Sequence, residues 1–263
     1  MNKGRYYGIK SSPAHVRDIL RMLISRDFKL RYKRSIFGVG WSLLVPLAQL
    51  AVLYLVFSQM LRLNIPHFTS FLLTGILPWT WFCNSLMYSS VTIVDNRELV
   101  KQVGFPVAVL PIAMVLSQLV HFIIAMPVLG AFLLADGFQP SLAILALPAV
   151  ILVQFMLTMS IAYLVATLQV RFRDTQYLLG IFLFLFFYLT PVFWDASLVP
   201  EPFHSFLLLN PVGTLLNNYR DIFMRGQVPA LLPLAVVAGI SFVALALGYL
   251  LFLQARDRFV EEL

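Results

Sequence analysis

Residues 26–60, RDFKLRYKRSIFGVGWSLLVPLAQLAVLYLVFSQM, decide the fold class of this chain. Five of the first nine side chains are basic: Arg26, Lys29, Arg31, Lys33 and Arg34. No charged residue follows from residue 35 to residue 61, a run long enough to cross a hydrocarbon core of about 30 Å as a helix. A basic cluster directly before an apolar span stays on the cytoplasmic side. The stretch therefore predicts a transmembrane helix that starts at the cytoplasmic surface.

The remainder of the chain repeats this pattern of long neutral runs between short charged clusters. Only 12% of the 263 residues are charged, whereas soluble domains contain about a quarter. Five more charge-free runs follow the first, at residues 63–94, 102–135, 137–170, 175–194 and 226–255. The sequence predicts an all-α membrane protein with six transmembrane helices in one domain, residues 35–255. With Cys83 as the only cysteine, we expect neither an intrachain disulfide nor a metal site.

The distribution of positive charge predicts the orientation of these helices. If six spans are counted, sixteen Lys and Arg side chains lie on the side of the N-terminus and three on the other side. This asymmetry places both termini in the cytoplasm. Residues 1–34 then form a cytoplasmic N-terminal segment and residues 256–263 a short cytoplasmic tail. The net charge of +7 is explained by topology and by anionic lipid headgroups, so nucleic acid is not an expected partner.

The N-terminal segment is expected to contain an amphipathic helix that lies in the membrane surface. Ser12 is a suitable N-cap and Pro13 suits the first turn. Apolar residues beyond Pro13 fall roughly on one helical face and basic residues on the others. Asp27 interrupts the apolar face, and an ion pair with Arg31 four residues later would neutralise it.

A polar stretch before the last span predicts a different kind of segment. Residues 202–219, PFHSFLLLNPVGTLLNNY, are apolar in part but include a histidine, two prolines and three asparagines. A full span here would also move the C-terminal cations to the outer side. We expect residues 196–224 to form an outer re-entrant hairpin, broken at Asn210 and Pro211.

Several kinds of chemistry are missing from the sequence. There is no phosphate-binding loop of the G-x-x-x-x-G-K-[ST] type, and no carboxylate falls inside a span. Ion-coupled transporters usually carry ionisable groups at that depth. His121, one turn after Gln118, is the only titratable candidate there, and a hydrogen-bonded packing role is expected for it. The chain is therefore interpreted as a transport pathway whose energy comes from a partner.

Ordered motifs over nearly the whole chain resemble the membrane subunit of ABC-2-type exporters of polysaccharides and teichoic acids. The similar stretches are RDFKLRYKRSIFGVGWSLLVPL at residues 26–47, FLLTGILPWTWF at 71–82, NRELVKQVGFP at 96–106, RFRD at 171–174, LTPVFW at 189–194 and LLNPVGTLLNNYRDIF at 208–223. The resemblance implies a homodimeric permease in a bacterial inner membrane. It also implies two copies of a separate ATPase, which bind ATP and Mg²⁺.

The same resemblance implies a lipid-linked glycan as substrate, with O-antigen preferred to capsule or teichoic acid. A small lipid or drug is an alternative cargo. A membrane component of glycan assembly that does not transport is an alternative of another class.

The resemblance also assigns residues to roles. The cytoplasmic turn after the second span would be the coupling segment, about residues 95–105, that docks on the ATPase through Asn96, Arg97, Glu98, Leu99, Val100 and Lys101. Aromatic faces suit the C–H surfaces of sugar rings, so the fifth span supplies candidate pathway or gate residues. These candidates are Tyr188, Trp194, Phe182 and Phe186.

Tryptophans and the basic cluster suggest where a lipid-linked substrate could enter. Trp41, Trp79 and Trp81 are expected near the headgroups as interfacial anchors. A lipid pyrophosphate could be attracted by the basic cluster next to Trp41, which consists of Arg26, Lys29, Arg31, Lys33 and Arg34.

Overall fold

A computed structural model describes residues 12–62, 65–195, 199–200, 202 and 209–263 of the chain. In these residues the fold is helical, with no strand. The α-helices are α1 (Pro13–Tyr32), α2 (Trp41–Leu53), α3 (Phe68–Asp95), α4 (Arg97–Val100), α5 (Val109–Ala135), α6 (Leu147–Arg171), α7 (Thr175–Leu189), α9 (Pro211–Phe223) and α10 (Leu231–Glu262). Short 3₁₀ turns precede α2 and α6, at Gly38–Gly40 and Leu142–Ala146, and a π-helix, Tyr54–Met60, continues α2.

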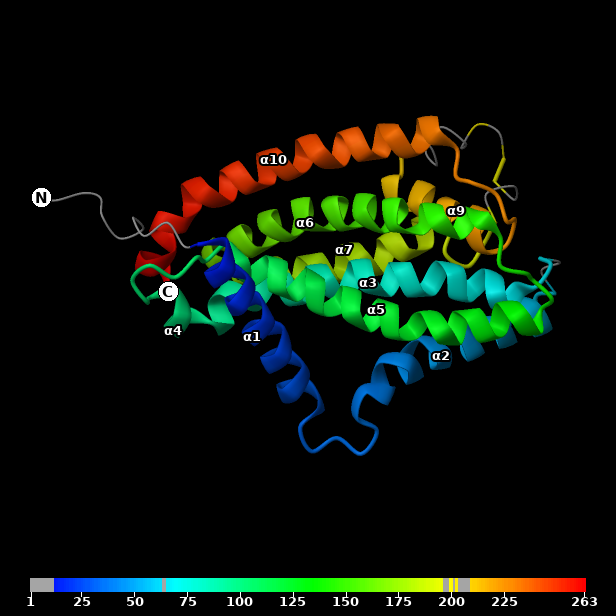
Figure 1. The fold of residues 1–263 in the computed structure, drawn as a ribbon, viewed down its shortest axis with the longest axis horizontal. Helices are drawn as coiled ribbons and strands as arrows, with labels where there is room; N and C mark the ends of the chain where they lie inside the picture. The colour runs from blue at the N-terminus through cyan, green and yellow to red at the C-terminus, as the bar shows by residue number, and fades with distance from the viewer. Residues whose placement is uncertain (1–11, 63–64, 196–198, 201, 203–208) are drawn as a thin grey trace, which may run out of the picture.

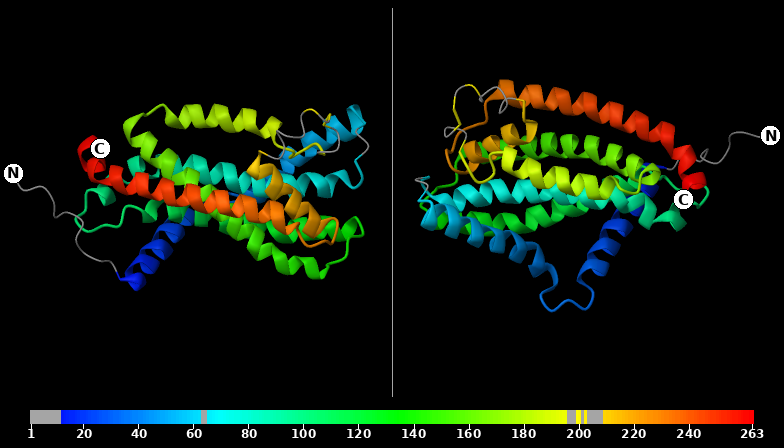
Figure 2. Two further views of the ribbon diagram at one scale, coloured as in Figure 1. Left: turned by 90° about the horizontal axis from the view of Figure 1, so that it is seen from above. Right: turned by 180° about the vertical axis from the view of Figure 1, so that it is seen from behind.

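The long helices run side by side along the length of the molecule (Figure 1). The start of α1, the short helix α4 and the end of α10 lie at one end, called here the α4 end, and α9 lies towards the other. α1 and α2 form a V whose apex, residues 33–40, stands out from the bundle in the views from both sides (Figure 2). α10 lies along the opposite edge, packed on α6.

Four helical segments among the described residues are long and apolar enough to cross a membrane. They are Gly38–Met60, Val109–Ala135, Leu142–Arg171 and Leu231–Glu262. They correspond to four of the six predicted spans. The predicted fifth span forms α7, which has 15 residues and is about 22 Å long at 1.5 Å per residue. That length is below the thickness of a hydrocarbon core of about 30 Å.

The predicted second span forms α3, which lies in the centre of the bundle. It packs against α2, α5, α6, α7 and α9, and most of its side chains are buried. Ser70, Thr74, Ser85, Ser89 and Thr92 are among the buried residues, which lowers the hydropathy of the helix. A helix enclosed by other helices can carry hydroxyl groups that a lipid-facing helix would have to avoid. Its position therefore explains why composition alone does not mark α3 as a span.

Local signals in the sequence explain where several helices begin and end. The Ser12 hydroxyl accepts a hydrogen bond from the amide of His15 at 3.3 Å, as expected of the N-cap of α1. The Asn210 side chain accepts from the amide of Gly213 at 3.0 Å, and Pro211 is the first residue of α9. The predicted break at Asn210 and Pro211 is therefore the start of a helix.

A buried arginine joins α9 to the centre of the bundle. Arg220 is 1% exposed, and its guanidinium lies 3.7 Å from the centre of the Phe71 ring on α3 and donates to the carbonyl of Val192 at 2.8 Å. α3 and the segment that contains Val192 approach closely at Gly75 of α3, where a Cβ atom would lie 2.6 Å from the carbonyl oxygen of Val192. Val192 follows α7, so this contact ties α3, α9 and the end of α7 together.

A second close approach of two backbones lies between α10 and α6. A Cβ atom on Gly248 would lie 2.7 Å from the carbonyl oxygen of Ser160, whereas one on Gly239 meets no atom within 4 Å.

Gly248→Ala is expected to destabilise the bundle by about 1–3 kcal/mol, since a backbone has to shift. Gly239→Ala is the matched control and should unfold at the same temperature as the wild type or higher, because alanine favours a helix. Thermal unfolding of the purified chain in detergent measures both, and equal midpoints for the two variants would contradict the packing described.

Candidate functional site

A cavity of about 400 Å³ lies between α1, the start of α2, and the middle of α3 and α5. Its size falls within the range of about 300–1,000 Å³ that is typical of small-molecule sites. The side chains that line it are mostly aromatic or uncharged and polar. They include Tyr32, Trp41, Ser42, Thr80, Trp81, Asn84, Tyr88, Gln118, His121 and Phe122, together with Arg31.

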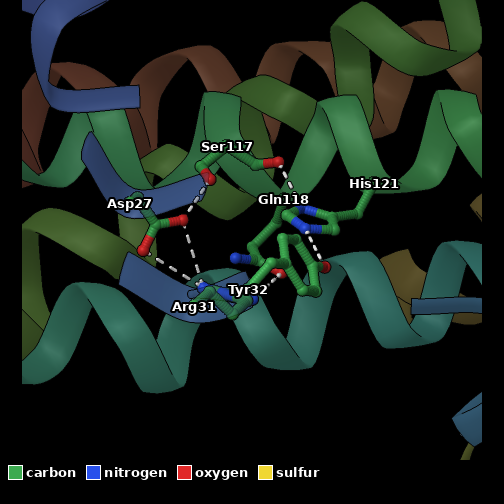
Figure 3. Close-up of polar contacts among 6 residues, drawn as sticks. All are labelled: Asp27, Arg31, Tyr32, Ser117, Gln118 and His121. Atoms are coloured by element: carbon green, nitrogen blue, oxygen red, sulfur yellow. Dashed lines mark hydrogen bonds and ion pairs between the residues drawn. The ribbon is translucent and has the colours of Figure 1, made fainter. Parts of the chain in front are cut away.

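The wall formed by α1 is attached to α5 through a carboxylate (Figure 3). The Ser117 hydroxyl on α5 donates to Asp27 at 2.5 Å, and Arg31 pairs with the same carboxylate at 3.2 Å. Arg31 also donates to the amide oxygen of Gln118. The predicted Asp27–Arg31 pair is confirmed, and its carboxylate additionally binds the neighbouring helix.

His121 forms the second attachment between α1 and α5. Its Nδ1 lies 2.7 Å from the carbonyl of Ser117 and its Nε2 lies 2.6 Å from the hydroxyl of Tyr32. A carbonyl can only accept, so the proton is on Nδ1, and in the neutral ring Nε2 accepts from Tyr32. Burial raises the pKa of the Tyr32 hydroxyl above its ordinary value, which keeps its proton in place. The ring of Phe28 stacks on His121 with a centre separation of 4.4 Å, so His121 has the hydrogen-bonded packing role that was expected.

The single full charge on the cavity wall is largely neutralised. Of the lining residues, only Arg31 carries one, and it is paired with Asp27 and lies 4.2 Å from the centre of the Tyr88 ring. Both members of the pair are about one-fifth exposed. The cavity is therefore close to electrically neutral.

The five predicted basic residues do not form one site. Arg31 lines the cavity, whereas Arg26, Lys29 and Lys33 border a separate open hollow on α1, the basic hollow. Arg34 lies at the apex of the V with a backbone φ of 63°. Arg26 also donates to the side chain of Asn96 at the C-terminal end of α3.

The tryptophans expected at the headgroups occupy two kinds of position. Trp41 is 48% exposed and lines the cavity, so it lies beside the basic cluster as expected. Trp79 and Trp81 are buried, contrary to the expectation of interfacial anchors. The Trp81 ring donates to the carbonyl of Val115 and stacks on Phe122 of α5. Both belong to the central helix α3, where packing against neighbouring helices decides their position.

The predicted coupling segment forms α4 and its flanking turns at the α4 end of the bundle. Asn96 ends α3, with its side-chain amide donating to the carbonyl of Thr92 at 2.8 Å, and its own carbonyl starts α4. Val100 is buried against the bundle and therefore cannot face a partner. Arg97, Glu98 and Lys101 are exposed and Leu99 is half-buried. Val103, two residues further, is 71% exposed.

The predicted pathway aromatics on α7 are divided between an open face and the bundle. Phe182 and Tyr188 are 57% and 52% exposed. Phe186 is half-buried and packs between Phe182 and Trp79, with ring centres 5.3 Å and 5.7 Å away. Trp194 is half-buried, and its ring nitrogen donates to the carbonyl of Tyr188 at 3.2 Å.

The predicted hairpin is described only in part. Residues 196–198, 201 and 203–208 lie outside the described residues, so its first half cannot be placed. In its second half, α9 packs against α3, α6 and α10. The Asn210 side chain donates to the Thr190 hydroxyl at 3.0 Å, which holds the start of α9 against the end of α7.

Sequence reasoning missed most of the cavity wall. Trp81, Asn84 and Tyr88 on α3 contribute one side, and Gln118 and His121 on α5 contribute another. The signal was their spacing, since residues three, four or seven apart share one helical face. A polar and aromatic stripe on a charge-free helix could have identified α3 as a cavity wall.

Comparison with known proteins places the chain in a family. Residues 19–224 match the family described as ABC-2 type transporter. The O-antigen export system permease protein RfbA of Klebsiella pneumoniae is 32% identical over 257 residues, 97% of this chain and 98% of the relative. The protein of the same name from Myxococcus xanthus is 34% identical over 249 residues, 94% of this chain and 96% of the relative.

A more distant relative is the polysialic acid transport protein KpsM of Escherichia coli, 22% identical over 233 residues, which are 88% of this chain and 90% of the relative. The family match covers most of the chain, and the RfbA proteins of Klebsiella pneumoniae and Myxococcus xanthus match nearly all of it. With its apolar helices, the chain is an integral membrane protein. It belongs to the ABC-2 type transporter family, as a transport subunit rather than an enzyme.

Proposed function

We propose that the chain is the permease subunit of an ATP-driven exporter that moves a lipid-linked O-antigen polysaccharide from the cytoplasm across the bacterial inner membrane. The observation that carries this proposal is the similarity, at 32–34% identity over nearly the full length, to two O-antigen export permeases. The polysialic acid transport protein is less similar, at 22% identity, which favours O-antigen over polysialic acid as the glycan.

In this proposal ATP and Mg²⁺ act on a separate ATPase, present in two copies, and two copies of the permease form the pathway. All six predicted helices cross the membrane, with α3 enclosed by neighbouring helices and α7 leaving one face open. The start of α1, α4 and the end of α10 share one end of the bundle, which supports a common cytoplasmic side for both termini (Figure 1). α9 then belongs to the outer re-entrant segment.

The exposed side chains at the α4 end are proposed to dock on the ATPase. Glu98 and Lys101 offer charged contacts and Val103 an apolar one, whereas Val100 anchors α4 to the bundle. The end of α10 supports this arrangement, because Phe259 is buried and α10 contacts α4.

A double substitution tests this docking surface. Lys101→Glu with Val103→Asp should reverse one charge and place another on the apolar contact, without altering the buried Val100. The ATPase is expected to copurify with the variant at less than a tenth of the wild-type amount in detergent. Arg17→Glu, a charge reversal at an exposed position of α1, is the control and should retain the ATPase. Full retention by the double variant would remove these residues from the interface.

The open face of α7 is proposed to contact the glycan or the second copy of the permease. Aromatic rings offer apolar faces to sugar C–H groups without holding the polymer by many hydrogen bonds, which suits a sliding chain. Tyr188 belongs to this face, and its backbone carbonyl accepts a hydrogen bond from the ring nitrogen of Trp194. The two aromatic residues therefore lie next to each other at the end of α7.

Tyr188→Ala and Trp194→Ala test the pathway by export. Each is expected to lower surface polysaccharide several-fold at an unchanged permease level, because each removes an aromatic face from the proposed path. Immunoblots for polysaccharide and permease provide the measurement. Phe242→Ala, at a 64% exposed aromatic position of α10, should export normally. Normal surface polysaccharide in both α7 variants would exclude these side chains from the path.

The basic hollow is proposed to attract the pyrophosphate of the lipid carrier. Lys29 and Lys33 border it, and both are exposed on the face of α1 that does not bind α5. Flexible ammonium groups can neutralise a phosphate without a rigid geometry. This position leaves the lipid tail free to remain in the bilayer beside α1.

A further inference from the structure

The wall of the cavity between α1, α2, α3 and α5 has the chemistry of a sugar site. Trp41 and Tyr88, which are 48% and 40% exposed, supply aromatic side chains from two helices, and the buried Trp81 belongs to the same wall. Aromatic faces bind the C–H faces of apolar and amphipathic molecules, and sugar rings present such faces between their hydroxyl groups. The cavity therefore offers flat surfaces on more than one side.

Two polar side chains on the wall are available for hydrogen bonds. Asn84 and Thr80 line the cavity, and within the described residues neither side chain makes a hydrogen bond with another group of the chain. An amide both donates and accepts, as does a hydroxyl, which matches the paired donor and acceptor character of sugar hydroxyls. A few polar groups among apolar walls are the usual composition of a small-molecule site.

The charge of the cavity argues against an anionic occupant. Arg31 is the only lining residue with a full charge, and Asp27 pairs with it at 3.2 Å. A pyrophosphate in this cavity would approach the Asp27 carboxylate as well as the guanidinium. The basic hollow, by contrast, is bordered by Arg26, Lys29 and Lys33.

The neutral cavity and the basic hollow are neighbours, because Tyr32 borders both. A lipid-linked glycan has the same arrangement, a pyrophosphate directly attached to a sugar. We propose that the cavity binds one sugar unit of the lipid-linked glycan, while the attached pyrophosphate stays at the basic hollow. This inference rests on the proposed export function and adds a recognition site for the sugar nearest the lipid.

A binding experiment with two probes tests the proposal on the permease–ATPase complex in lipid nanodiscs. One probe is a polyprenyl pyrophosphate that carries a single N-acetylhexosamine, and the other is the same polyprenyl pyrophosphate without a sugar. The wild type is expected to bind the sugar-bearing probe about five- to tenfold more tightly, the effect of one or two net hydrogen bonds. Asn84→Leu, of similar volume, should lose this preference and bind the bare probe as the wild type does.

Two further variants keep the test decisive if Asn84→Leu does not fold. Trp41→Leu removes an aromatic side chain that is 48% exposed, so its effect on the core is small, and it should also lose the preference for the sugar. Lys29→Gln with Lys33→Gln should weaken both probes by the same factor. Phe242→Leu, at an exposed position of α10, is the control and should behave as the wild type.

The outcomes separate the two levels of the proposal. Equal affinity of the wild type for both probes would overturn the sugar site, and so would an equal loss of both probes in Asn84→Leu and Trp41→Leu, which would indicate an anionic headgroup in the cavity. Surface O-antigen is measured in parallel in cells that carry the wild-type gene or a deletion. If the deletion leaves surface O-antigen unchanged, the export function is wrong; if it abolishes O-antigen while the probes bind equally, only the sugar site is wrong.

Discussion

The attachment of α1 to α5 is the contact on which the candidate site depends. Asp27 accepts from Ser117 and pairs with Arg31, and Tyr32 bonds His121, so two consecutive turns of α1 are held on one face of α5. Breaking a partly buried ion pair leaves one charge without its partner, which costs more than the pair itself contributes. The two attachments therefore act together. Without them α1 could swing away at the apex of the V, and the cavity would lose one wall.

The central position of α3 gives the other wall its rigidity. Its aromatic and polar side chains are held by neighbours on several sides, as in the stacking of Trp81 on Phe122 and its bond to Val115. The Gln154 amide of α6 donates to the carbonyl of Pro78 at 2.9 Å and ties the same helix from the opposite direction. A site built on such a helix keeps its geometry better than one built on a loop.

The sequence predicted what depends on neighbouring residues and missed what depends on the packing of distant ones. The start of α1 at Ser12 and the Asp27–Arg31 pair are local and were confirmed, whereas the predicted break at Asn210 and Pro211 is the start of α9. The four apolar helices followed from charge-free runs. The burial of Trp81 and Val100 could not be predicted, because it depends on which helices surround α3 and α4. The separation of Arg31 from Lys29, by contrast, follows from helix geometry, because residues two apart on a helix point to different faces.

The burial of Arg220 has a consequence for how the protein is made. Its contacts, the Phe71 ring and the Val192 carbonyl, both belong to parts of the chain that leave the ribosome before residue 220 does. The receiving surface on α3 therefore exists before the arginine that fills it. A buried guanidinium without partners is costly, so α9 is stabilised by binding that surface. The partners of Arg220 thus precede it in the chain, with Phe71 synthesised about 150 residues earlier.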